Sequence, residues 1–467
     1  MTAVAAPAAP EIDSLVTPTP AAPQTHPDPA PGRHLGLIVA GALACGLVAA
    51  LLLVAAPFVR PEDSAVTGAV LLGFALGWAM LALLTLRFTD QPQRWAVVPA
   101  AFMGLGGLLL ILFGSPVQPV LNWLWPPLLL VLALWMAVRV HRHLRSRIGR
   151  WLLYPVIAVL AIASIGGGVE TVLEAADARD HPMAGQLIDV GGHRLHLRCT
   201  GTGSPAVVLE PGGGEMSAVL GWIEPAVARD TRVCVYDRAG RGWSEPADAP
   251  QDATQIATDL HALLLHADVA GPYVLAGHSF GGLYVQTFAA LYPDDVAGLV
   301  LIDSTAPATE AGARSASAAD PYDLSGRVAA LVSASARLGV GRIYALFDYD
   351  SLPTTSRAEA RASVAKGGQL GSTVEEYLVA SASMEQAAAL ASFGDKPLVV
   401  LAAGTGSAPG WFADQEALAA LSTNSAYRVV DGATHASLVS DEENAAVTAQ
   451  AILDVVTSVR SGAPLPE

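Results

Sequence analysis

Charged side chains are scarce in this sequence, and cysteines are scarcer still. Asp, Glu, Lys and Arg make up 15% of the 467 residues, whereas an ordinary soluble domain carries about 25%. This shortage excludes a wholly soluble enzyme and a disordered polyelectrolyte, and the 52% of hydrophobic residues indicates that part of the chain lies in lipid. Three cysteines are too few for a disulfide scaffold or a four-cysteine zinc site.

The sequence also lacks an excess of basic residues. Its formal net charge is −16, which argues against nucleic acid as a partner. The first 170 residues contain nine arginines and seven acidic residues, whereas the remainder contains 17 basic and 35 acidic residues. The two parts of the chain therefore occupy different environments.

Residues 1–34 lack the apolar content that a folded segment needs. Ala, Pro and Thr predominate, and eight of the first 32 residues are proline. This composition predicts a disordered tail. A signal peptide is not expected, because no basic stretch precedes an apolar core at the start of the chain.

Residues 35–170 are predicted to form five transmembrane helices. The apolar runs are 35–59, 64–86, 95–114, 119–139 and 151–169. Each approaches the roughly 20 residues that span a bilayer as a helix. None has Asp, Glu, Lys or Arg at its centre, and transporters usually need such groups at mid-membrane. An anchor or small helical bundle is therefore expected, rather than a transporter.

Arginines in the loops predict the orientation. The loop after the fourth run, 140–150, contains Arg142, Arg145, Arg147 and Arg150. By the positive-inside rule this loop is cytoplasmic. The tail is then also cytoplasmic, and everything after the fifth run lies outside, in a multi-pass protein of the plasma membrane. A cytoplasmic C-terminal half is the alternative, because the charge rule has exceptions.

Residues 183–467 have the size of one domain and show short apolar strands alternating with helix-like stretches. The expected strands are 186–190, 194–199, 206–210, 232–237, 273–277, 297–303, 397–403 and 427–431. This alternation predicts a mainly parallel sheet covered on both faces. The Ala-rich interval at about 306–395 lacks a strong strand and is expected to form a helical cap.

The segment Gly277-His278-Ser279-Phe280-Gly281-Gly282 follows a predicted strand and opens a predicted helix. In this context G-x-S-x-G is the nucleophile elbow, in which Gly277 and Gly281 permit a strained turn that exposes Ser279. At this point the chain resembles the α/β-hydrolase family over nearly all of 183–467. The resemblance implies an oxyanion hole made by the backbone N–H groups of Gly213, in a glycine-rich loop after a strand, and of Phe280.

A serine hydroxyl needs a base to take its proton. Of the 11 histidines, His435 lies just beyond the last strand, where the family carries its base. The acid is expected to be Asp303, at the end of a strand where a subset of the family keeps it, with Asp414 as the alternative. The side chain of His278 is expected to point away from the site.

The resemblance makes the strands of Cys199 and Cys234 neighbours. An outward-facing domain would allow the two cysteines to form a disulfide, and two buried thiols are the alternative. Cys45 lies within the first apolar run.

These residues predict a membrane-anchored serine hydrolase of carboxylic esters, including lipid or other apolar acyl substrates. No H-E-x-x-H helix or Cys–His cluster is present, so neither a metal nor an organic cofactor is expected. Three alternatives stay open: an acyltransferase, an amidase with the same triad, and a catalytically silent membrane sensor or binding module. The expected partners are the ester substrate and the bilayer, and the sequence does not define an oligomeric state.

Overall fold

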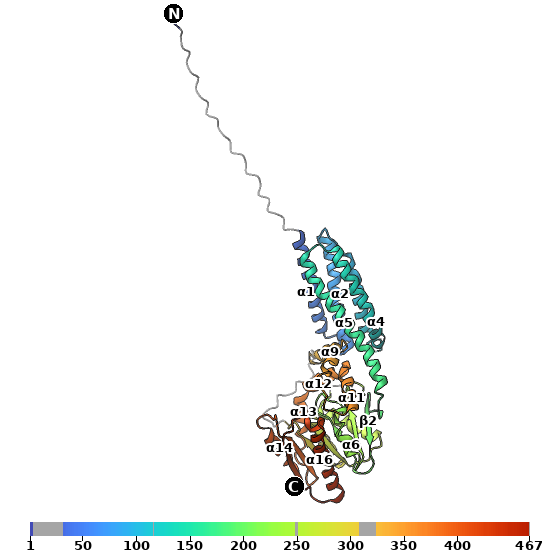
Figure 1. Ribbon diagram of the computed structural model, residues 1–467, viewed down its shortest axis with the longest axis vertical. Coiled ribbons are helices and arrows are strands. Elements are labelled where there is room, and N and C mark those ends of the chain that lie inside the picture. Colours follow the sequence, from blue (N-terminus) through green and yellow to red (C-terminus); the bar gives the residue numbers. More distant parts are fainter. Residues whose placement is uncertain (3–30, 115, 248–250, 308–323, 467) are drawn as a thin grey trace.

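The computed structural model describes residues 1–2, 31–114, 116–247, 251–307 and 324–466. A bundle of long helices forms one end of the described molecule, and a helix-covered sheet forms the other (Figure 1). Most of the predicted tail, residues 1–34, lies outside the described residues. Its last four residues, 31–34, belong to the first helix.

The bundle contains five helices that are long and apolar enough to cross a membrane. They are α1 (Pro31–Val54), α2 (Asp63–Phe88), α3 (Val97–Phe113, preceded by the 3-10 turn η1, Arg94–Ala96), α4 (Gln118–His143) and α5 (Arg147–Asp180). The prediction of five apolar helices before the sheet domain is confirmed. The fifth helix, however, continues past residue 170 to Asp180.

Glycines let these helices approach closely. A Cβ atom on Gly73 of α2 would lie 2.3 Å from the backbone of Ala50 in α1, and one on Gly68 would lie 2.8 Å from the carbonyl oxygen of Gly107 in α3. Small residues at such crossings are typical of membrane helix packing. These glycines therefore serve the packing of α1, α2 and α3 against one another within a single chain.

The second part of the chain is built on one eight-stranded sheet in the order β1-β2-β4-β3-β5-β6-β7-β8. The strands are β1 (Gln186–Asp189), β2 (Arg194–Thr200), β3 (Val207–Glu210), β4 (Val233–Asp237), β5 (Tyr273–His278), β6 (Val296–Ile302), β7 (Leu398–Ala403) and β8 (Ser425–Val430). Strands β1 and β2 are antiparallel to their neighbours, and the other pairs are parallel. The predicted mostly parallel sheet is confirmed.

Alternate residues of each strand face opposite layers of helices. In β5, Val274 and Ala276 join the core beneath α6 and α16, whereas Tyr273 and Leu275 join the core beneath α7, α8 and α14. The covering helices are η2 (Ser217–Leu220), α6 (Ile223–Val227), α7 (Ala253–His266), α8 (Phe280–Leu291), η3 (Pro293–Asp295), α14 (Trp411–Ala419), α15 (Ser437–Ser440) and α16 (Glu442–Ser461). Burial on both faces explains why the central strands read as continuous apolar runs.

The interval between β6 and β7 is mainly helical in its described part. It contains α9 (Leu324–Ala336), α10 (Val340–Ala345), α11 (Thr354–Ala365), α12 (Gly367–Leu378) and α13 (Ala380–Ala387). We call these helices the cap. Figure 1 shows α9 and α12 between the bundle and the sheet.

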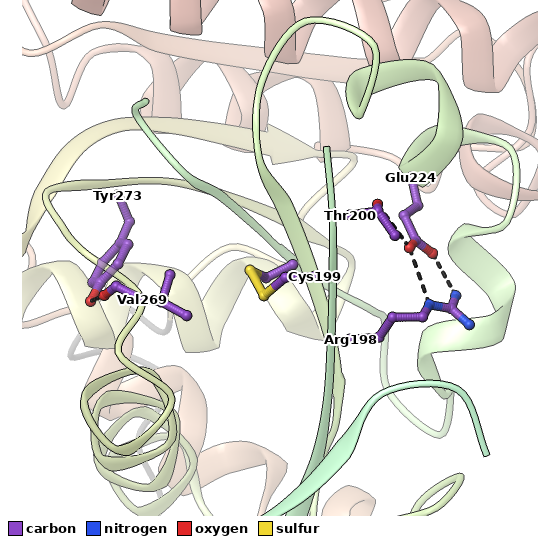
Figure 2. The surroundings of a disulfide bond; sticks show 7 residues. Arg198, Cys199, Thr200, Glu224, Val269 and Tyr273 are labelled. Atoms are coloured by element: carbon purple, nitrogen blue, oxygen red, sulfur yellow. Dashed lines mark hydrogen bonds and ion pairs between the residues drawn. A yellow bond between two sulfur atoms is a disulfide. The ribbon is translucent and has the colours of Figure 1, made fainter. Parts of the chain in front are cut away.

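A disulfide joins Cys199 and Cys234, which are paired residues on the adjacent strands β2 and β4 (Figure 2). Beside it, Arg198 and Thr200 of β2 both contact the Glu224 carboxylate of α6, and the Arg198 Nε lies 3.1 Å from Glu224 Oε1. Cys45 is free and half-buried. The edge of the sheet that carries β1 and β2 is thus cross-linked to the parallel strands.

Candidate active site

Ser279 occupies a strained turn between β5 and α8. Its φ of 55° and ψ of −121° lie in a region that L-residues avoid, at a cost of about 1–3 kcal/mol. The flanking glycines make the turn feasible, since a Cβ on Gly277 would lie 2.4 Å from the Gly281 carbonyl oxygen and one on Gly281 would lie 2.6 Å from the Glu210 carbonyl oxygen. Only glycine fits at either position, so these two residues permit the turn that Ser279 occupies.

Asp303 directly follows β6 and also has a positive φ, of 43°. Its side chain is buried, with 2% exposure. One carboxylate oxygen accepts hydrogen bonds from the Ala403 N–H (3.0 Å) and the Trp411 indole N–H (2.6 Å), and the other contacts His435. Burial alone would raise the pKa of Asp303, but the hydrogen bonds from His435, Ala403 and Trp411 outweigh burial and lower it. The carboxylate is therefore ionised at neutral pH.

His435 lies in the loop between β8 and α15, and its side chain is 46% exposed. The distance from His435 Nδ1 to Asp303 Oδ2 is 2.6 Å. Because a carboxylate only accepts hydrogen bonds, Nδ1 donates its proton to it, which leaves the lone pair on Nε2. Imidazole in this tautomer can act as a base. The structure thus joins two of the predicted site residues, Asp303 and His435.

The alternative acid, Asp414, lies in the first turn of α14. That helix contributes to the site through Trp411, whose ring meets the His435 ring edge-on at 6.2 Å and whose indole holds Asp303. In the part of the chain that the structure describes, the carboxylate that contacts the His435 ring belongs to Asp303.

The glycine-rich loop after β3 lies against the residue that follows Ser279. A Cβ on Gly213 would lie 3.0 Å from the ring of Phe280. The neighbouring amides are in use, since the Gly212 N–H donates to Glu215 and the Gly214 N–H donates to Glu376, both at 2.8 Å. The Phe280 N–H is the first of α8 and has no acceptor within the helix. The two predicted oxyanion donors, Gly213 and Phe280, therefore belong to neighbouring segments.

A buried ionic network holds the glycine-rich loop that follows β3. Glu376 of α12 accepts the Gly214 N–H, lies 3.0 Å from the Arg238 guanidinium, and also contacts Arg241 and the Tyr284 hydroxyl (2.6 Å). Arg238 in turn donates to the carbonyl oxygens of Pro211 (2.9 Å) and Gly212 (2.6 Å). Sequence reasoning missed Glu376, because no local motif distinguishes it from other polar residues of the cap, such as the adjacent Glu375.

Loss of the Glu376 carboxylate is expected to be costly. Glu376→Ala would leave Arg238 and Arg241 buried without their shared partner, and breaking a buried ion pair costs about 3–5 kcal/mol. Thermal or denaturant unfolding of the purified protein measures this loss. Glu359→Ala is the matched control, because Glu359 is a partly exposed cap residue that lies 4.0 Å from Arg198. Equal stability of the two variants would contradict the role of the network.

His278 corrects an expectation. Instead of pointing away from the site, its buried ring lies 4.6 Å from the ring of His435, and its Nε2 lies 3.0 Å from the His435 carbonyl oxygen. The other ring nitrogen lies 3.4 Å from Glu215, the residue that also holds the Gly212 amide. Burial opposes a positive charge on His278, but Glu215 and the His435 carbonyl oxygen outweigh it and raise the pKa of His278. His278 therefore links the His435 loop to the glycine loop.

Within the described ranges, no group of three or more His, Cys, Asp or Glu side chains is arranged to hold a metal ion.

A mostly parallel sheet with a serine in the turn between a strand and a helix is the arrangement of α/β-hydrolases, and the comparison with protein families gives the same result. The model of the alpha/beta hydrolase fold matches residues 205–442, which is half of the chain, so this chain belongs to the α/β-hydrolase fold family.

Individual relatives match smaller parts. An uncharacterized protein of Schizosaccharomyces pombe is 43% identical over 82 residues, which are 18% of this chain and 15% of that protein. An uncharacterized vacuolar membrane protein of Saccharomyces cerevisiae is 32% identical over 132 residues, 24% of this chain and 20% of that protein. The chain thus spans a fifth or less of the length of these two relatives. Among solved structures, the enol-lactonase of Burkholderia xenovorans is 21% identical, with a TM-score of 0.43, covering 58% of this chain and 100% of that one.

Proposed function

We propose that this protein is a membrane-anchored serine hydrolase that cleaves carboxylic esters. The observation that carries the proposal is the hydrogen bond between His435 and buried Asp303, in a fold where Ser279 occupies a strained turn at the start of α8. Strained backbone conformations of this kind are concentrated at functional sites. Here the strained turn would present a nucleophile to an oriented base.

In the proposed reaction, the Ser279 hydroxyl oxygen attacks the ester carbonyl carbon while His435 Nε2 takes the hydroxyl proton. The Gly213 and Phe280 N–H groups stabilise the oxyanion of the tetrahedral intermediate. The C–O bond to the alcohol then breaks, and His435 returns the proton to the leaving alcohol. Water then attacks the carbonyl carbon of the acyl-enzyme while His435 takes its proton. The bond to Ser279 Oγ breaks, His435 returns the proton to Oγ, and the acid is released.

Asp303 supports both halves of this cycle. Its ionised carboxylate accepts the Nδ1 proton of His435 and stabilises the imidazolium that forms each time a proton is taken up. The hydrogen bonds from Ala403 and Trp411 hold the carboxylate in place without neutralising it.

We further propose a plasma-membrane location, with the N-terminus in the cytoplasm and the hydrolase domain outside. Arg142 and Arg145 lie where α4 passes into α5, at the cytoplasmic end of the bundle by the positive-inside rule. The cap contacts the opposite end, at Asp63 and Glu170. The Cys199–Cys234 disulfide fits an oxidising, extracytoplasmic location.

A thiol count checks this location. Protein extracted under non-reducing conditions and denatured is expected to show one titratable thiol, Cys45, and three after reduction. Cys45→Ala should then show none before reduction. Three thiols before reduction would contradict an oxidising environment for the hydrolase domain.

Labelling of intact cells with a membrane-impermeant fluorophosphonate tests the proposed function. Labelling that disappears in Ser279→Ala would establish a reactive serine and its outward exposure together. Labelling only after lysis would keep the enzyme and reverse the topology. Folded protein that labels in neither condition would contradict the proposed chemistry and favour a binding module.

A further inference from the structure

The cap is attached to one end of the helix bundle through charged side chains. Arg327 donates to the carbonyl oxygen of Val54, the last residue of α1. Arg337 pairs with Asp63, the first residue of α2. These contacts join the cap to the ends of two helices that are apolar enough to cross a membrane.

The fifth helix supplies the third attachment. Arg342 of α10 lies 2.8 Å from Glu170 and 2.8 Å from Asp177, both in α5. Just before α10, the backbone of Leu338 lies against Gly166, where a Cβ would come within 2.4 Å of the Leu338 carbonyl oxygen. The start of α10 is therefore held directly against α5.

This contact lies where α5 changes from apolar to polar. Its apolar run ends at Val169, and Glu170, Glu174 and Asp177 follow. The boundary between the hydrocarbon core and the headgroups of a bilayer falls at such a transition. Segment 338–347 starts against Gly166, and its Arg342 reaches Glu170 and Asp177, so the segment lies beside this transition.

The same segment exposes large apolar side chains. Val340, Ile343, Tyr344, Leu346 and Phe347 are each at least half exposed, and Phe347 is 84% exposed. On α5, the helix that Arg342 contacts, Val169 and Val172 are also exposed. A soluble protein rarely presents such a patch to water, but apolar side chains next to charged ones are typical of segments that lie in a membrane interface.

One aromatic ring of the cap reaches the residue that follows Ser279. The ring centroid of Tyr377, on α12, lies 5.2 Å from that of Phe280. The cap that carries the patch therefore also contacts the turn that holds the nucleophile.

We propose that segment 338–347 inserts its apolar side chains into the outer leaflet, and that the enzyme takes an amphiphilic ester directly from the bilayer. The occupant of the patch is lipid, because the patch continues the exposed apolar surface of α5. The bundle then has a role beyond anchoring, since it holds the cap at the depth where such a substrate resides. The substrate part of this inference rests on the proposed function; the membrane contact does not.

Fluorescence quenching in nanodiscs tests the contact without using activity. Bimane is attached to Phe347→Cys in full-length protein that carries Cys45→Ala. The matched control is Val447→Cys on α16, which is 41% exposed and belongs to the end of the molecule far from the bundle (Figure 1). Lipids spin-labelled near the headgroup are expected to quench the probe at 347 and not at 447, and aqueous iodide to do the reverse. Iodide quenching at both positions would overturn the proposal, and so would protection of position 347 from both quenchers, which would indicate a protein partner or a second copy.

Activity tests the substrate. Ile343→Ser combined with Phe347→Ser is expected to lower the kcat/KM for a long-chain ester embedded in the nanodisc about tenfold, and to leave that for a short soluble ester unchanged. Equal losses on both esters would contradict uptake from the membrane. If wild-type protein hydrolyses neither ester although lipid quenches position 347, the proposed function fails and the membrane contact stands.

Discussion

Alanine in place of Ser279 is expected to lower the kcat for ester hydrolysis by about 10⁶-fold. The residual rate would come from the oxyanion donors and from substrate binding alone. Because the side chain is removed at Oγ and nothing larger is added, the loss should appear in kcat far more than in KM. Single-turnover and steady-state assays with a chromogenic ester measure both constants. Activity above about a hundredth of wild type would exclude Ser279 as the nucleophile.

Stability measurements separate this loss from misfolding. Alanine keeps the strained φ of 55°, so Ser279→Ala should unfold within about 0.5 kcal/mol of wild type. Ser279→Gly removes the strain and is expected to be more stable by about 1 kcal/mol, while being equally inactive. If an inactive variant were also markedly less stable, misfolding would account for its loss of activity instead of the missing nucleophile.

The sheet and the two ends of the triad could be predicted because their signals are local. Strands β5 and β6 are short apolar runs bounded by glycine, proline and acidic residues, and the predicted strands differ from the observed ones by at most two residues at each end. The elbow needs glycine at positions 277 and 281 for steric reasons that act within a few residues. His435 and Asp303 each follow a strand, and parallel strands bring their C-terminal ends to one edge of the sheet.

The far end of α5 could not be predicted from hydropathy. Beyond Glu170 the helix leaves the apolar run, and its continuation to Asp180 is supported by Arg342 of the cap, which pairs with Glu170 and Asp177. Arg342 is more than 160 residues away in sequence. A pattern confined to one segment contains no information about such a partner.

The positions of the Glu376 and His278 side chains could not be predicted for the same reason. Glu376 gains its role only where α12 meets the Gly214 amide and the Arg238 guanidinium. The sequence places His278 next to Ser279, but alternation along a strand says only that the two side chains diverge. That the ring lies against His435 depends on how the β8–α15 loop folds over it. Tertiary packing decided both positions.

Asparagine in place of Asp303 is expected to lower kcat by about 10⁴-fold. The side chain keeps its shape and its contacts with Ala403 and Trp411, but an amide nitrogen facing His435 would favour the tautomer with the proton on Nε2, which cannot accept a proton from Ser279. The pKa of Asp303 is lowered in the folded protein, so its charge stabilises the fold above the unfolded pKa of about 3.9, and this contribution is lost as the pH falls through the folded value. Asp303→Asn should therefore also flatten the pH dependence of unfolding below about pH 4.

Asp414→Asn is the matched substitution, because it makes the same chemical change in the alternative acid. Asp414 lies in the first turn of α14, where a negative charge favours the helix by about 0.3–1 kcal/mol. Its loss is expected to lower stability by no more than that amount and to leave kcat within about twofold of wild type. If Asp414→Asn abolished hydrolysis while Asp303→Asn retained it, the hydrogen bond between His435 and Asp303 would be structural, and the base would need a different partner during turnover.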